Sequence, residues 1–322
     1  MDLAATRTQY LDAPARAAHL PPHTILVVVD PTAHAQPALE KAVRIASRCG
    51  SQLELYICDV EQQIPESWAG GARFDQYRKL RRQQLLDDLE ALAQPLRDRG
   101  LAVGVVCEWH APLEQGIGFH AIRSRPDLVV KETHWHARMR TGTQGQTDWH
   151  LARQVPMPLL LVRARPWPEQ LRFAAAVDPC HPADRPATLD AAILRDSRSL
   201  ARALGGALDV YHVLQMPPHL PGEYVPLEEI AALHANTRTV VAQLAQTAEV
   251  VPQFTEGLVA EGLARLANQH HPDVLVMGAV ARARSAPAPA GGTASLVLEQ
   301  VHCDLLVVKP PGFVSPLLVT AE

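Results

Sequence analysis

The chain has 322 residues, more than one hydrophobic core usually supports, so two domains of about 150 residues are the simplest expectation. Hydrophobic residues make up 47%, charged residues 20%, and the formal net charge is −4, which excludes a globally basic surface for nucleic acid or anionic lipid. No apolar run reaches the roughly 18 residues of a membrane span. Five dispersed cysteines without a CxxC pair indicate a reducing compartment, the cytoplasm.

Residues 1–21 hold several prolines and no continuous apolar stretch, so we predict an N-terminal arm rather than a signal peptide. From residue 24 onward, short apolar runs alternate with segments of helical period, which is typical of a parallel sheet covered by helices on both faces. Segment 37–49 opens with proline and ends before Gly50, which predicts a helix. The predicted strands of this half are 24–30, 53–59, 102–108, 127–132 and 158–163.

The second half repeats the first. An apolar strand closed by Asp-Pro occurs at Asp30 and again at Asp178, and the Pro-Asp pairs at Asp127 and Asp273 lie 146 residues apart. A Pro-Trp-Pro sequence within 164–170 marks the linker. The predicted strands are 171–177, 208–214, 250–255, 273–278 and 304–309, with a helix at 187–204. The expected domains are 22–163 and 171–311, followed by a tail at 312–322.

We therefore expect an α/β fold of two tandem doubly wound five-stranded parallel sheets. Ligands bind such sheets in the crevice where the strand order reverses, here between strands one and four. The residues at those strand ends are Asp30, Lys131 and Glu132 in the first half and Asp178, Met277 and Gly278 in the second.

A long loop follows the fourth strand of the second half and leads to Gly291-Gly292-Thr293 before a helix. Small residues allow close approach of an anion, and the free N–H groups at a helix start attract it. Arg282 and Arg284 would add positive charge. The residues therefore predict a phosphate cradle, with an ordinary helix cap as the open alternative.

Val-Asp on strand one, Pro-Asp-Val-Leu-Val-Met-Gly on strand four and Cys-Asp-Leu-Leu-Val-Val on strand five together resemble the universal stress protein domain. Nucleotide-binding members of that family carry Gly-x2-Gly-x9-Gly-Ser/Thr. This sequence has Gly278, Ala281, Gly291 and Gly292 at those positions, with Thr293 next, so the spacing is retained and two identities are not. The resemblance spans residues 22–311.

Further motifs, including Asp30-Pro31, Trp109-His110 and residues 147–151, resemble the bacterial E-type tandem members of the family. The resemblance implies a cytoplasmic, non-enzymatic binding and regulatory module of the general stress response, with adenine nucleotide such as ATP in the second half. A slow ATP hydrolase or a small-ligand carrier is the alternative, although no nucleophile motif is present. The implied nucleotide contacts are Asp178 and Val213 for base and ribose, and Gly278, Ala281, Arg282, Gly291, Gly292 and Thr293 around the phosphates.

The first half departs from this pattern, because Glu132 replaces the strand-four glycine and Asp148 lies near the next helix start. Like charges a few ångströms apart cost about 1 to 4 kcal/mol, so we predict that this half holds no triphosphate. In the second half, Ala281 is expected to weaken nucleotide binding.

Other clusters favour structural interpretations. His110, His134, His136 and His150 lack metal-ligand spacing, so no metal is expected. Trp109, Trp135, Trp149 and Trp167 fit packing, with an apolar or aromatic ligand as the alternative. The basic run 78–82 fits a solvated helical face.

The fifth strand of each half is apolar and lies at a sheet edge that must be covered or paired. We therefore expect the halves to pack as a pseudo-dimer through these edges. A homodimer of whole chains and unknown protein partners are left open.

Overall fold

The computed structural model describes residues 20–59, 71–133, 144–180, 188–216, 224–279 and 292–318. These residues form two compact units. The first unit holds the described residues up to 166 together with 314–318, and the second holds those of 167–313. The chain therefore leaves the first unit, builds the second and returns to the first.

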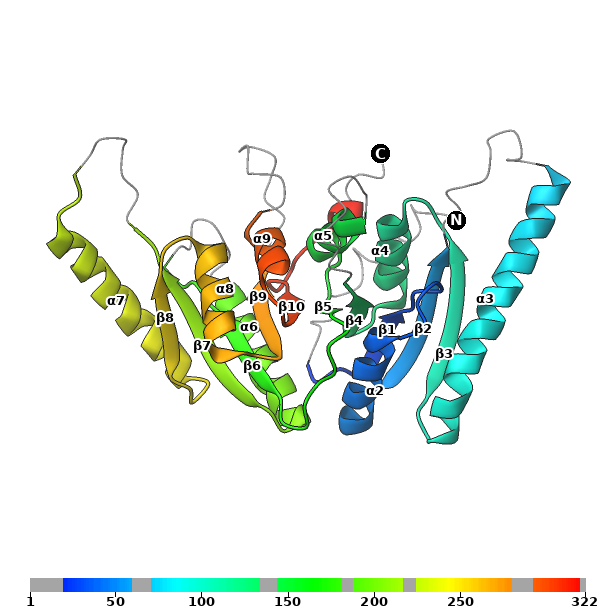
Figure 1. Cartoon of the computed structure of the whole chain (residues 1–322), viewed down its shortest axis with the longest axis horizontal. Helices are drawn as coiled ribbons and strands as arrows, with labels where there is room; N and C mark the ends of the chain where they lie inside the picture. The colour runs from blue at the N-terminus through cyan, green and yellow to red at the C-terminus, as the bar shows by residue number, and fades with distance from the viewer. Residues whose placement is uncertain are drawn as a thin grey trace. The chain divides into compact units, whose positions relative to one another are not determined.

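The first unit contains a parallel five-stranded sheet in the order β3-β2-β1-β4-β5 (Figure 1). β1 pairs with β2 on one side and with β4 on the other, so the strand order reverses between β1 and β4, as predicted. Residues 25–27 of β1 are fully buried, which explains the continuous apolar run. The strands are β1 Thr24–Val28, β2 Gln52–Asp59, β3 Val103–Trp109, β4 Leu128–Glu132 and β5 Leu159–Val162.

Because connections between parallel strands follow the right-handed rule, this strand order places α2 and α3 on one face of the sheet and α4 and α5, which touch one another, on the other. The helix predicted at 37–49 is confirmed, and it ends at Gly50 with a positive φ of 68°. The C-terminal turn η2 (Pro316–Leu318) packs on α4. The helices are α2 Pro37–Cys49, α3 Ala72–Asp98, α4 Leu113–Ser124 and α5 Gln144–Gln154.

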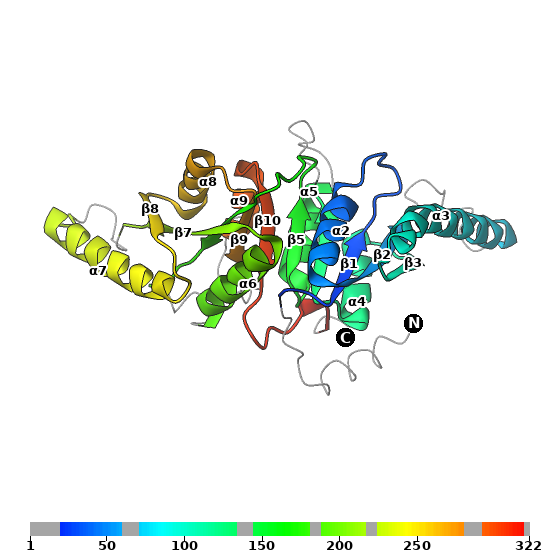
Figure 2. The same ribbon diagram turned by 90° about the horizontal axis from the view of Figure 1, so that it is seen from below.

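The second unit repeats this arrangement in the order β8-β7-β6-β9-β10 (Figure 2). The predicted strands of both halves are confirmed, with ends that differ by one or two residues. Among the described helices, none combines the length and apolarity needed to cross a membrane. The elements are β6 Arg172–Ala176, α6 Thr188–Leu204, β7 Ala207–Leu214, α7 Leu227–Gln246, β8 Pro252–Glu256, α8 Val259–His270, β9 Val274–Gly278, α9 Gly292–Gln300 and β10 Asp304–Val308.

The repeated Pro-Asp pairs tie strand one to strand four in each unit. Asp127 Oδ2 accepts the backbone N–H groups of His23 and Thr24 at 2.9 and 3.0 Å. Asp273 Oδ2 accepts the N–H of Arg172 at 2.9 Å in the same way. Because these carboxylates satisfy backbone donors at the start of a buried strand, the repeat has an architectural cause.

Candidate functional site

The crevice of the second unit lies where β6 and β9 end side by side. β6 and β9 are parallel neighbours with Ala175 opposite Val276, so Asp178 and Gly278 both lie at the carboxyl ends of adjacent strands. The N–H of Asp178 donates to Asp190 Oδ1 of α6 at 3.0 Å, which fixes the backbone at this strand end. The structure therefore brings together two of the predicted ligand contacts.

Gly278 is required by packing. A Cβ at this position would lie 2.5 Å from Leu189 Cδ2, and Leu189 is buried in α6. Val213, predicted to face base and ribose, is also buried, with its two methyl groups against Gly262 of α8. Because the Val213 side chain is already packed, the part of this residue that could contact a ligand is its backbone.

The phosphate end of the crevice is described only in part. Gly292 and Thr293 form the start of α9, whose free N–H groups suit an anion. Ala281, Arg282 and Gly291 lie outside the described residues. Sequence reasoning overlooked Lys309, a buried lysine after β10 whose Nζ donates to the carbonyl of Ala279 at 3.2 Å. The positive charge of Lys309 therefore lies beside Ala279, the residue that follows Gly278.

The equivalent crevice of the first unit contains an internal ion pair. Lys131 Nζ lies 2.8 Å from Asp148 Oδ1, and Thr133 Oγ1 donates to Asp148 Oδ2 at 2.7 Å. Asp148 belongs to α5 and is buried, and these two contacts join α5 directly to the end of β4. The Asp148 carboxylate, expected to repel phosphate, thus already has a cation, and Glu132 adds a second carboxylate at the end of β4.

The segment after β1 is held by hydrogen bonds among its own residues. Asp30 Oδ1 accepts the N–H of Thr32 at 2.8 Å and its hydroxyl at 2.6 Å. Gln36 Nε2 donates to the carbonyl of Asp30 at 2.7 Å. These bonds form an Asx turn that leads into α2, so Asp30 has a structural role in the first unit.

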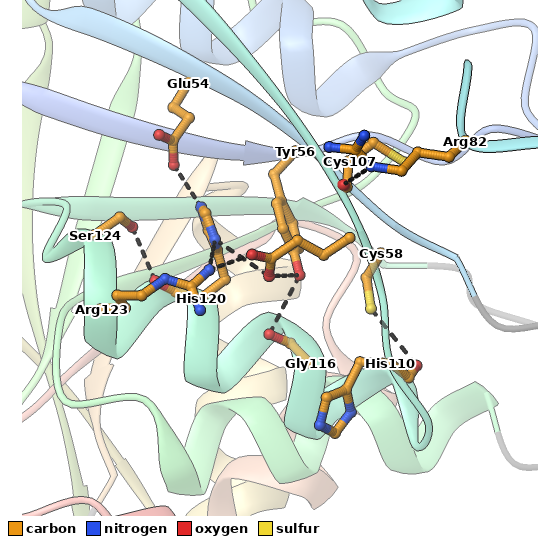
Figure 3. A network of polar contacts seen from close by, with 11 residues as sticks. Glu54, Tyr56, Cys58, Arg82, Cys107, His110, Gly116, His120, Arg123 and Ser124 are labelled. Carbon is orange, nitrogen blue, oxygen red and sulfur yellow. Dashed lines mark hydrogen bonds and ion pairs between the residues drawn. The ribbon is translucent and has the colours of Figure 1, made fainter. Parts of the chain in front are cut away.

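A partly buried polar network links β2, β3 and α4 in the first unit (Figure 3). His120 stacks on Tyr56 with ring centroids 4.1 Å apart and planes inclined by 14°. Its Nε2 lies 2.6 Å from Glu54 Oε1, and its Nδ1 lies 3.4 Å from Glu108 Oε2. Arg123 pairs with the other oxygen of Glu108 and also lies 2.8 Å from His120 Nδ1.

The charges in this network shift each other's pKa values. The hydrogen bond from His120, supported by its charge and that of Arg123, lowers the pKa of Glu108 to about 2, although burial opposes this. For His120, burial lowers the pKa, but the bonds to Glu108 and Glu54 outweigh burial, so the pKa of the imidazole lies above its usual value. The contact with Arg123 favours the neutral ring, but the two carboxylates decide the direction.

This network reads as a structural element rather than a reaction centre. Tyr56 is fully buried, and its hydroxyl lies 3.2 Å from Glu108 Oε2 and 3.3 Å from the Gly116 carbonyl. Burial raises the pKa of the Cys58 thiol to about 11, so this sulfur is a poor nucleophile at neutral pH. No sequence motif marked these residues, because they come from three separate elements.

The remaining predicted clusters have varied surroundings. His134, Trp135 and His136 lie outside the described residues, and the described ones include no group of three residues suited to a metal ion. Trp149 lies beneath Arg153 of α5, with the guanidinium carbon 5.6 Å from the ring centroid. Trp167 belongs to the second unit, where its Nε1 donates to Asp304 at 2.7 Å.

The sequence alone suggested that the basic run on α3 is a solvated face, but its side chains also make specific contacts with the sheet. Arg81 pairs with Asp59 at 3.2 Å, and Arg82 Nε donates to the carbonyl of Cys107 at 3.4 Å. Arg78 lies over the rings of Phe74 and Trp109. The run therefore fixes the N-terminal half of α3 against β2 and β3.

Comparison with known proteins agrees with the duplicated fold. The sequence profile of the universal stress protein family matches residues 22–163 and 172–309. Universal stress protein E of Salmonella typhi is 28% identical over 92% of this chain and 98% of its own length, and that of Escherichia coli K12 is 26% identical over 92% and 97%.

Solved structures show the same architecture over about nine tenths of the chain. A protein of unknown function from Pseudomonas aeruginosa PAO1 superposes with a TM-score of 0.70 at 25% identity, covering 90% of this chain and 93% of the other. A universal stress protein from Archaeoglobus fulgidus DSM 4304 gives a TM-score of 0.62 at 14% identity, covering 89% and 96%, which shows the shared fold. The chain thus belongs to the universal stress protein family, as a tandem member with two copies of the domain.

Proposed function

We propose that this protein is a cytoplasmic, non-enzymatic regulatory module of the stress response whose second unit binds adenine nucleotide. The observation that carries the proposal is the contrast between the two crevices. In the second unit, Gly278 places no side chain at the end of β9, and the start of α9 offers the N–H groups that a helix N-terminus presents to an anion, with Lys309 nearby. In the first unit, Glu132 and the bonded pair of Lys131 and Asp148 occupy the equivalent place.

Calorimetric titration with ATP tests this proposal. We expect one site per chain, with weak affinity because alanine replaces glycine at position 281. Asp178→Ala should weaken binding, since Asp178 ends the strand that borders the crevice. Asp209→Ala is the matched control. Asp209 lies near the N-terminal end of β7, away from the crevice at the carboxyl ends of the strands, and pairs with Arg172 at 3.5 Å.

Three outcomes would contradict the proposal: no binding at millimolar ATP, two sites per chain, or equal weakening by both substitutions. A slow ATP hydrolase remains the second candidate, because an adenine nucleotide site is common to both functions. It predicts release of ADP on prolonged incubation, with loss of turnover in Asp178→Ala. A non-enzymatic module predicts that bound ATP is recovered intact. Fold alone does not distinguish the two.

A further inference from the structure

A second pocket lies in the first unit between α3 and the edge strand β3, separate from the crevice between β1 and β4. Its volume is 340 Å³, which lies in the range of small-molecule sites. Its lining residues are Asp75, Arg78, Lys79, Arg82, Leu85, Cys107, Glu108 and Trp109.

The inner wall of this pocket is apolar. Leu85 and Cys107 are buried, and Trp109 is half-buried beside them. Burial raises the pKa of the Cys107 thiol, so the sulfur is uncharged at neutral pH. Phe74 meets Trp109 edge to face, with centroids 6.5 Å apart and planes at 88°. Such a wall favours a flat apolar group.

The rim of the pocket is cationic. Arg78, Lys79 and Arg82 all line it, and none of the three forms an ion pair with a carboxylate of the described residues. Of the two acidic residues in the lining, Glu108 is already bonded to His120 and Arg123. Three cations therefore face the single carboxylate of Asp75, which favours an anionic ligand.

Arg78 is held in a geometry suited to receive a carboxylate. Its guanidinium carbon lies 5.1 Å from the Trp109 ring centroid and 5.7 Å from that of Phe74. These contacts with ring faces use none of the N–H donors of Arg78, and a guanidinium fork can bind a carboxylate in bidentate fashion. Arg82, also on α3, donates its Nε–H to the carbonyl of Cys107 on β3 at 3.4 Å.

We propose that this pocket binds a small aromatic carboxylate, with its ring against Trp109 and Leu85 and its carboxylate at Arg78 and Arg82. The volume excludes a large ligand, the apolar wall accounts for the ring, and the uncompensated cations account for the charge. This site is independent of the nucleotide crevice, because it lies in the other unit.

Fluorine NMR titration of the full chain with para-trifluoromethylbenzoate tests the proposal. We expect saturable binding in the millimolar range or tighter. The neutral para-trifluoromethylbenzamide should bind at least about tenfold more weakly, since a charged hydrogen bond is replaced by a neutral one. Arg78→Gln/Arg82→Gln should weaken benzoate binding by about tenfold as well.

The matched control is Arg73→Gln/Arg99→Gln, which removes the same charge from exposed positions on or next to α3 and outside the pocket. This control should bind benzoate like the parent chain. Trp109→Leu should weaken binding while circular dichroism confirms the fold. The proposal is overturned if benzamide binds as tightly as benzoate, if both double variants bind equally, or if no saturable binding occurs.

Discussion

At the scale of single residues, two glycines have equivalent roles in the two units. A Cβ on Gly116 would lie 2.6 Å from Cys58 Sγ, and a Cβ on Gly262 would lie 2.7 Å from both methyl carbons of Val213. In each unit the helix before strand four thus approaches strand two at a glycine. This close approach is a repeated packing feature that the sequence repeat alone did not reveal.

We expect Gly262→Ala to lower the free energy of unfolding by about 1 to 3 kcal/mol, because overpacking exceeds the gain in helix propensity. Urea denaturation measures this change. Gly104→Ala is the control, since a Cβ there meets no atom within 4 Å and the residue has no positive φ, and it should change stability little. Val213→Ala should recover part of the loss in the Gly262→Ala background. Equal stability of Gly262→Ala and the parent chain would refute the packing argument.

The His120 network predicts a specific pH dependence. The folded-state pKa of His120 is raised, so its stabilising contribution is full below the unfolded pKa of about 6.5 and is lost as the pH rises through the folded value. Glu108, with a pKa of about 2, stays charged throughout this range. Hence the stability difference between the parent chain and His120→Gln should be larger at pH 5.5 than at pH 9.

Urea denaturation of both proteins across that range provides the measurement. Glu108→Gln is the control, because it removes one of the two carboxylates that raise the pKa of His120. It should reduce the pH dependence. A difference between parent and His120→Gln that does not vary with pH would show that the ring is neutral throughout.

At the scale of elements, the ion pair at the end of β4 holds α5 in place. Lys131→Met would leave Asp148 buried without its cation, which costs about 3 kcal/mol or more of stability. Lys131→Met/Asp148→Leu should be much less destabilised, because no unpaired charge remains. Thermal or urea unfolding of both variants measures the effect. If the double variant is as unstable as the single one, the pair does not provide this stabilisation.

The elements were largely predictable and the side-chain pairs were not. Continuous apolar runs in strands such as 25–27 follow from burial on both faces of a parallel sheet, so they can be read directly from the sequence. The bonds of Lys131 with Asp148 and of Glu54 with His120 join residues 17 and 66 positions apart. Periodicity carries no information on such pairs, which depend on the register of separate elements.

The nucleotide crevice was predictable only in outline. The strand order placed Asp178 and Gly278 at neighbouring strand ends, because the reversal between strands one and four follows from the fold class. The burial of Val213 and the position of Lys309 were not predicted, since each depends on close packing between elements. Contacts assigned to Ala281, Arg282 and Gly291 stay predictions.

At the scale of the whole molecule, the first unit is completed by residues 314–318, which follow the second unit in the chain. Leu317 and Leu318 are buried against Ile122 and Phe119 of α4, and Leu317 also closely approaches Gly118. Ser315 Oγ donates to the carbonyl of Gln154 at 2.6 Å. The sequence suggested only a tail here, because three residues of 3₁₀ helix give no periodic signal.

Leu317→Ala should therefore destabilise the first unit by about 3 kcal/mol, the usual cost of a cavity left by a buried leucine. Hydrogen exchange in α4, together with urea denaturation, measures the loss. Val314→Ala is the matched control, because Val314 is 51% exposed. If both substitutions have the same small effect, the C-terminal segment does not stabilise this unit. Packing of the units through their fifth strands stays a prediction.

The central claim is that only the second unit admits a nucleotide. Photo-crosslinking of the intact chain with azido-ATP, followed by mass spectrometry of its peptides, tests it most directly. We predict label, removable by excess ATP, on peptides of residues 167–313 alone. Specific label on the peptides around Glu132 would contradict the account.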